Sequence, residues 1–210
     1  KFKGLIPKYY PKKYKSYIKD ETKLLKQKLN GVNRVLEAGV GIGRLIPAIA
    51  PLVKEFVGID NSHFMLKESI KVARNYSNVR IIMENIENIS KKFPKNYFDY
   101  SLCVWNTLGN VKSQVKVLEE LNKVTKNSII ITVFWKGTTK DRLDFYKYVD
   151  VEVEKIDKND ETFYLKGYTS KTFNMEDIKN LAEKSGLRVK NFKILGDVIL
   201  WAELIRNSNN

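Results

Sequence analysis

Residues 35–44 read VLEAGVGIGR, an apolar run that leads directly into three glycines spaced one residue apart. Residues 34–38 have the composition of a buried strand, and residues 45–50 are predicted to open a helix. Glycine suits a sharp turn against which a ligand lies, because a Cβ there would collide with it. The stretch therefore predicts a strand, a ligand-binding turn and a helix. A tight strand–helix turn without a ligand also explains a glycine run taken alone.

An acid follows the next predicted strand, residues 56–59. Asp60 lies 17 positions after Gly43, and a carboxylate at the end of that strand can accept two hydrogen bonds from a ribose diol. The two features together suggest recognition of adenosine. A dinucleotide fold would place the third glycine one residue later and hold a pyrophosphate at the helix N-terminus. Here the spacing is G-x-G-x-G, and Glu37 stands two residues before Gly39.

The rest of the chain alternates short apolar runs with amphipathic segments, which is typical of an α/β fold with parallel strands joined by helices. Further helices are predicted at residues 15–29, 62–73, 115–124 and 175–184, and further strands at 79–83, 98–105, 128–135, 187–194 and 198–205. Residues 149–156 and 162–168 alternate in polarity around a turn-rich segment, so we expect a hairpin inserted after the fifth strand. No repeat or linker divides the 210 residues, and we expect one domain.

The glycine-rich stretch, with Glu37 before it, resembles motif I of the class I S-adenosylmethionine-dependent methyltransferases, in particular the small-molecule enzymes of the type 11 and type 25 groups. The resemblance continues through residues 57–66, 98–100, 105–110 and 172–187, and covers roughly residues 30–205. The sequence departs from the family at residues 84–86, Glu-Asn-Ile, where the family usually has Gly-Asp-Ala. Asn85 can still donate to and accept from an adenine edge.

The resemblance implies a Rossmann-like sheet of seven mostly parallel strands, with helices on both faces, a reversed last strand, and S-adenosyl-L-methionine as cofactor. Its methionine moiety is expected near Glu37, Gly39 and Trp105, and its ribose on Asp60. The residues expected to bind the cofactor are Glu37, Gly39, Gly41, Gly43, Asp60, Asn61, Met65, Asn85, Ile86 and Trp105. Methyl transfer from a sulfonium gains most from alignment and exclusion of water, so no catalytic acid or base is assigned.

The N-terminal tyrosines suggest a lid over the cofactor. Tyr9, Tyr10 and Tyr14 would then shield the methyl group, with Asn106 and Trp135 as further walls of the acceptor site. Packing of an amphipathic helix on the domain explains the tyrosines equally well. We expect four parts within the domain: a helical lid (1–29), a cofactor-binding core (30–135), a cover hairpin (136–172), and a closing helix and strands (173–210).

The chain has one cysteine and one histidine, which excludes an internal disulfide and argues against a zinc site or any other metal. Cys103 is interpreted as a buried apolar residue and His63 as a surface residue at a helix start. No apolar run approaches the roughly 18–20 residues that a membrane span needs, and we expect a cytoplasmic protein.

The net charge of +14 raises the question of nucleic-acid binding, but only seven of the 38 basic residues are arginine. We therefore favour a small-molecule acceptor with a nucleophilic nitrogen or oxygen. The alternatives are an RNA or protein methyltransferase that uses its basic surface, and a cofactor-binding subunit without turnover of its own. The acceptor and the oligomeric state are not determined by the sequence.

Overall fold

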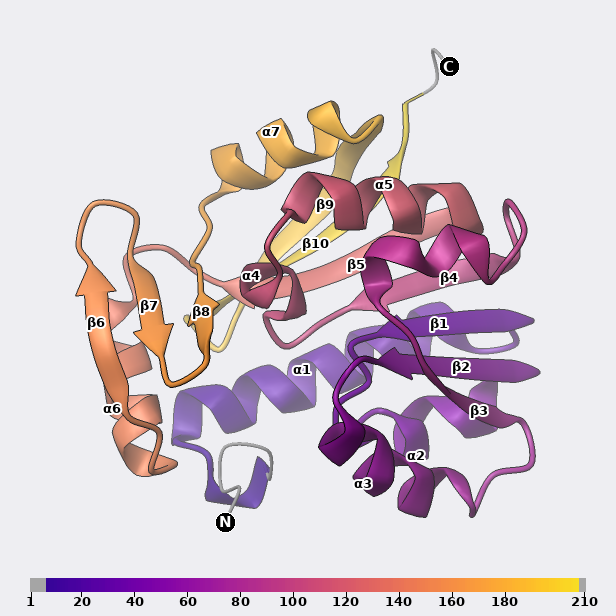
Figure 1. Cartoon of the computed structure of the whole chain (residues 1–210), viewed down its shortest axis with the longest axis horizontal. Coiled ribbons are helices and arrows are strands. Elements are labelled where there is room, and N and C mark those ends of the chain that lie inside the picture. The colour runs from indigo at the N-terminus through magenta and orange to yellow at the C-terminus, as the bar shows by residue number, and fades with distance from the viewer. Residues whose placement is uncertain (1–6, 208–210) are drawn as a thin grey trace.

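A seven-stranded sheet forms the centre of the computed structural model, which describes residues 7–207 (Figure 1). The strands lie in the order β3-β2-β1-β4-β5-β10-β9. Strand β10 is antiparallel to both of its neighbours, and the pairs among β1 to β5 are parallel, as predicted. The strands are β1 (Arg34–Ala38), β2 (Glu55–Asp60), β3 (Val79–Met83), β4 (Phe98–Cys103), β5 (Thr125–Phe134), β9 (Leu187–Leu195) and β10 (Ile199–Arg206).

Burial along the strands explains this order. Residues 128–134 of β5 and 199–204 of β10 are buried without interruption, because these central strands are covered on both faces. At the edge, β9 exposes most of its side chains. Strand β1 lies between β2 and β4, where the direction of the chain across the sheet reverses. Folds of this type bind ligands outside the carboxyl ends of the strands at that point.

Helices cover both faces of the sheet (Figure 1). One face carries α1 (Lys12–Leu29), α2 (Ile46–Ile49) and α3 (His63–Ala73), and the other carries α5 (Gln114–Val124) and α7 (Met175–Lys184). Ser62 caps α3 by accepting a hydrogen bond from the Met65 amide, as its sequence position predicts. The short helices are η2 (Pro7–Tyr9), η3 (Ala50–Leu52), η4 (Ile86–Lys91) and α4 (Thr107–Asn110).

The segment inserted after β5 is larger than the predicted hairpin. Strands β6 (Val153–Asp157) and β7 (Thr162–Leu165) form the expected antiparallel pair, and β8 (Tyr168–Ser170) adds a third strand. Helix α6 (Thr139–Tyr148) precedes them and was not predicted. Its buried residues are Arg142, Phe145 and Tyr146, and an arginine among them hides the apolar periodicity that marks a helix.

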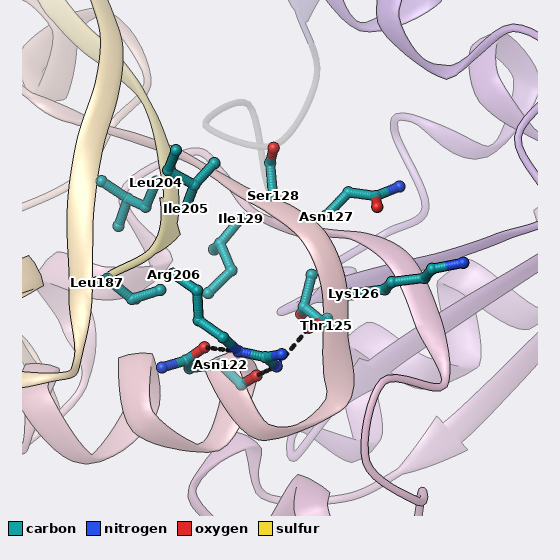
Figure 2. Close-up of a pocket in the computed structure, with 10 residues that line it drawn as sticks. All are labelled: Asn122, Thr125, Lys126, Asn127, Ser128, Ile129, Leu187, Leu204, Ile205 and Arg206. Atoms are coloured by element: carbon teal, nitrogen blue, oxygen red, sulfur yellow. Dashed lines mark hydrogen bonds between the residues drawn. The ribbon is translucent and has the colours of Figure 1, made fainter. Parts of the chain in front are cut away.

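At the amino end of β5, Arg206 fastens the last strand to the sheet (Figure 2). Its guanidinium donates to the Asn122 side chain at 3.0 Å, and to the backbone carbonyls of Asn122 and Thr125. The hollow beside it measures only about 10 Å³, room for no more than about one water molecule. It lies at the end of the sheet opposite the glycine turn, so it is a structural feature and not the ligand site.

Candidate functional site

The glycine turn after β1 has the backbone geometry that only glycine adopts without strain. Gly39 and Gly43 have φ angles of 79° and 82°. A Cβ on Gly39 would lie 2.6 Å from the Thr107 side chain, and one on Gly43 would lie 3.3 Å from the Cα of Ser69. The glycines thus let the turn pass between α4 and α3 at close range. Gly41, between them, lies in open space.

Asp60 at the end of β2 is joined to this turn. Its Oδ2 accepts a hydrogen bond from the Gly41 amide at 3.0 Å, and its Oδ1 accepts one from the Ser62 amide at 2.9 Å. The carboxylate is only partly buried, and each oxygen keeps a second lone pair for another donor. The structure thus brings together the turn and the acid that the sequence singled out separately.

Glu37 is a buried acid with an unused acceptor. Its side chain is 3% exposed, and within residues 7–207 its Oε2 has no hydrogen-bond partner. Burial raises the pKa of its carboxyl group to about 8, against the opposing influence of the Arg44 charge. A buried carboxylate without a partner is costly, so this position favours a cationic ligand group.

The residues expected around adenine lie at the ends of β2 and β3. Asn61 and Asn85 are exposed, Met65 is partly buried, and Ile86 is buried. The Asn85 side chain accepts from the Glu87 amide and begins η4. The backbone amide of residue 84 donates to the Asp60 carbonyl, which places the start of this loop next to the acid.

Trp105 is held in a stack of aromatic rings. The Trp105 ring lies parallel to the Tyr10 ring, with 5.1 Å between their centroids. It also lies nearly parallel to the Tyr17 ring, with 5.4 Å between their centroids. The predicted fourth strand reached Trp105, but β4 ends at Cys103 because Trp105 and Asn106 have left-handed φ angles of 54° and 59°.

The N-terminal tyrosines do not behave alike. Tyr10 and Tyr14 are buried, and Tyr14 meets the edges of Trp105 and Phe134, whereas Tyr9 is exposed. Tyr17, which was not predicted to line the site, is also buried. These rings place the start of α1 against the loop that follows β4.

Glu21 is a functional candidate that the sequence analysis missed. Its carboxylate lies fully buried on α1, with Oε2 2.6 Å from Nη2 of Arg44 in the glycine turn. The hydroxyls of Tyr17 and Thr132 donate to its Oε1. The sequence does carry a signal: Glu21 continues the buried stripe of α1, which is otherwise apolar or aromatic.

Asn106 and Trp135, the other candidate walls, differ in their surroundings. Asn106 is buried, donates to the Ser170 hydroxyl at 2.9 Å and accepts from the Phe134 amide at 3.0 Å. It therefore joins the ends of β4 and β5 to β8. Trp135 is partly buried and forms a backbone bridge with Phe173.

Comparison with known proteins finds similarity in the segment that contains the glycine turn and Asp60. Residues 35–128 match the family model described as a methyltransferase domain, from β1 through the glycine turn and Asp60 into β5. This match covers just under half of the chain.

Solved structures share the fold of this chain at low sequence identity. A protein from Pyrococcus horikoshii OT3 is 20% identical with a TM-score of 0.74, over 95% of this chain and 93% of that one. A SAM-dependent methyltransferase from Aquifex aeolicus is 19% identical with a TM-score of 0.67, over 90% of each chain. Magnesium protoporphyrin IX methyltransferase from Synechocystis PCC 6803, solved with bound SAH, is 14% identical with a TM-score of 0.65, over 92% and 87%. No curated protein matches the sequence.

Other features of the structure lie apart from the glycine turn. A cleft of about 350 Å³ lies between α7 and the insertion, lined by Lys136, Lys171 and Lys184 among others. Within residues 7–207, no helix combines the length and the apolar character that crossing a bilayer requires. Cys103 is buried, where burial raises the pKa of its thiol to about 12, and His63 is exposed at the first position of α3.

Proposed function

We propose that this protein is an S-adenosylmethionine-dependent methyltransferase that transfers a methyl group to a nitrogen or oxygen of a small molecule, with the cofactor held at the glycine turn. In this proposal the buried Glu37 carboxylate accepts from the ammonium of the methionine moiety. Its unpartnered Oε2 fits that role, because an ammonium supplies both the missing donor and the opposite charge. The ribose hydroxyls donate to the free lone pairs of Asp60.

The remaining cofactor contacts are proposed from where the residues lie relative to the glycine turn and Asp60. Asn61 and Met65 line one side of the adenine and Asn85 and Ile86 the other, at the ends of β2 and β3. Gly39, Gly41 and Gly43 let the turn pass close to the ligand. Trp105 closes the methionine end, where Arg44 lies 6.0 Å from its ring.

The bound cofactor supplies an electrophilic methyl group, and transfer is a displacement in which the acceptor attacks in line with the breaking bond. The protein contributes alignment and removal of water. Tyr10, Tyr14 and Tyr17 surround the Trp105 side of the site with buried rings. This enclosure supports chemistry that needs no dedicated acid or base.

The enclosure is also the observation that supports a small acceptor. At the ends of β4 and β5, α1 and the insertion cover the sheet, and Tyr10, Tyr14 and Phe145 there are all buried. A folded protein or an RNA helix would not fit beneath this cover without its displacement.

A macromolecular acceptor has one observation in its favour. The outer face of α1 exposes a row of lysines, which would suit a phosphate backbone. They are Lys12, Lys13, Lys15, Lys19, Lys23 and Lys26. Lys13 is already paired with Asp141 at 2.8 Å, and the row carries no arginine, the residue that binds phosphate in a bidentate manner.

Transfer of radiolabelled methyl from S-adenosylmethionine into a cell extract tests the proposal. The products are separated by size, with nuclease and protease controls. Label in the small-molecule fraction supports the proposal and provides a product to identify. Label that nuclease or protease releases supports the macromolecular alternative and contradicts the proposal. An absence of label also contradicts it and favours a subunit without turnover.

A further inference from the structure

Arg142 is a fully buried cation outside the cofactor site. It lies on α6 with 0% of its surface exposed, and its guanidinium is sandwiched between the rings of Phe134 and Phe163, 4.0 and 4.1 Å from their centroids. In the part of the chain that the structure describes, no Asp or Glu forms an ion pair with it. Buried charges are normally paired, because removing one from water is expensive.

Its hydrogen bonds are incomplete as well. Nε and Nη2 donate to the Tyr146 hydroxyl at 3.2 and 2.9 Å, and Nη2 also donates to the Ser170 carbonyl at 2.9 Å. Over residues 7–207 no acceptor receives a hydrogen bond from Nη1. All of the partners are neutral, so the positive charge is solvated only by rings and dipoles.

A second donor without a partner lies beside it. The Tyr14 hydroxyl is buried and makes no hydrogen bond within the described residues, and the Tyr14 ring contacts Phe134, the same ring on which the Arg142 guanidinium lies. The nearby acids Asp141 and Asp144 act on Tyr14 only through space, and Asp141 is paired with Lys13. Arg142 and Tyr14 thus present two buried donors and one uncompensated charge, which an anion would satisfy.

We propose that Arg142 and Tyr14 form a subsite for a carboxylate of the methyl acceptor. This inference rests on the proposed function and names its substrate class. A carboxylate carries one negative charge and two acceptor oxygens, which match one guanidinium and two free donors. A phosphate dianion would leave a second negative charge buried without a cation.

The subsite is close enough to serve the proposed reaction. The Phe134 ring contacts the Arg142 guanidinium, and its centroid lies 6.2 Å from that of the Trp105 ring. The Tyr14 ring contacts both Phe134 and Trp105. An acceptor with its carboxylate on Arg142 therefore extends toward Trp105 and the glycine turn. The subsite is closed to solvent in this conformation, so binding requires the first turn of α1 to move.

Chemical blocking of carboxylates tests the substrate class. The small-molecule fraction of a cell extract is treated with a carbodiimide and excess methylamine, which converts carboxylates to neutral amides, or with methylamine alone. After removal of the reagents, label transfer from S-adenosylmethionine is measured with the wild-type protein. We expect transfer to fall at least about tenfold, as loss of a charge-assisted contact predicts. Equal transfer to both samples overturns the subsite and leaves the small-molecule function standing.

A tyrosine variant separates binding from packing. The Tyr14→Phe substitution removes only a hydroxyl that has no partner, so a packing role predicts unchanged transfer and undiminished stability. The subsite predicts that label transfer into a diluted small-molecule fraction of the extract falls about tenfold. Affinity for S-adenosylhomocysteine should stay unchanged in calorimetry. Tyr148→Phe, an exposed tyrosine of the same helix as Arg142, is the matched control. Transfer by Tyr14→Phe equal to that by Tyr148→Phe overturns the proposal.

Discussion

Glu21 and Arg44 form an ion pair that joins the first helix to the glycine turn, with 2.6 Å between Oε2 and Nη2. Glu21 is fully buried, and the Arg44 side chain is largely so. Because Arg44 directly follows Gly43, the position of α1 is coupled to the glycine turn. The same helix carries Tyr17, whose ring stacks on Trp105, and Tyr14, the proposed anion contact.

Breaking this pair should destabilise the fold. Glu21→Gln removes the counter-charge of Arg44, and leaving one member of a buried pair uncompensated costs about 3 kcal/mol. Urea unfolding of Glu21→Gln and of Asp20→Asn, whose carboxylate makes only an exposed contact with Ser16, measures the difference. Equal unfolding midpoints for the two variants would show that the pair contributes nothing.

The buried acid Glu37 should make stability depend on pH. Its pKa is raised from 4.5 to about 8, so the folded state holds a proton that the unfolded chain releases. The contribution of Glu37 to the free energy of unfolding is therefore fully present below about pH 4.5 and is lost as the pH rises through 8. Glu37→Gln lacks this proton, so it should gain stability relative to the wild type as the pH rises from 5 to about 8. Denaturant unfolding of both proteins across this range measures the difference. If the free energies of unfolding of the two proteins change with pH in parallel, the raised pKa of Glu37 is refuted.

The stack on Trp105 should contribute measurably to the packing of the N-terminal segment. Tyr10→Ala removes a buried ring that contacts both Trp105 and Phe145, a loss of about 3 kcal/mol if the gap does not refill. Tyr9→Ala, at the exposed neighbour, should change stability by no more than about 0.5 kcal/mol. Thermal unfolding compares the two. If both variants unfold at the same midpoint temperature as the wild type, the stack is not part of the folded core in solution.

Local sequence patterns predicted the parts of the fold that repeat a simple period. The bounds of β1, β3 and α7 agree with the prediction, because each is a short run with clear apolar spacing and end signals. The meeting of Asp60 with the glycine turn also follows from topology, since neighbouring parallel strands end at the same edge.

The missed features all depend on contacts between distant segments. Arg142 reads as a solvent-facing residue of a polar segment until the insertion folds over it, and this concealed α6. Glu21 reads as one of several charges on a basic helix, although it lies on the buried stripe and pairs with Arg44. The left-handed turn at Trp105 and Asn106 has no glycine to mark it.

If the glycine turn and Asp60 hold the cofactor, changing Asp60 should weaken the binding of S-adenosylhomocysteine, which calorimetric titration measures. Asp99 is the matched control, because its carboxylate also accepts a backbone amide, that of Arg34, but at the opposite end of β1. Loss of a charge-assisted hydrogen bond predicts that Asp60→Asn binds about 1–3 kcal/mol more weakly than the wild type. Asp99→Asn should bind as the wild type does. Equal affinity of the folded Asp60→Asn variant and the wild type would contradict the assignment of the site.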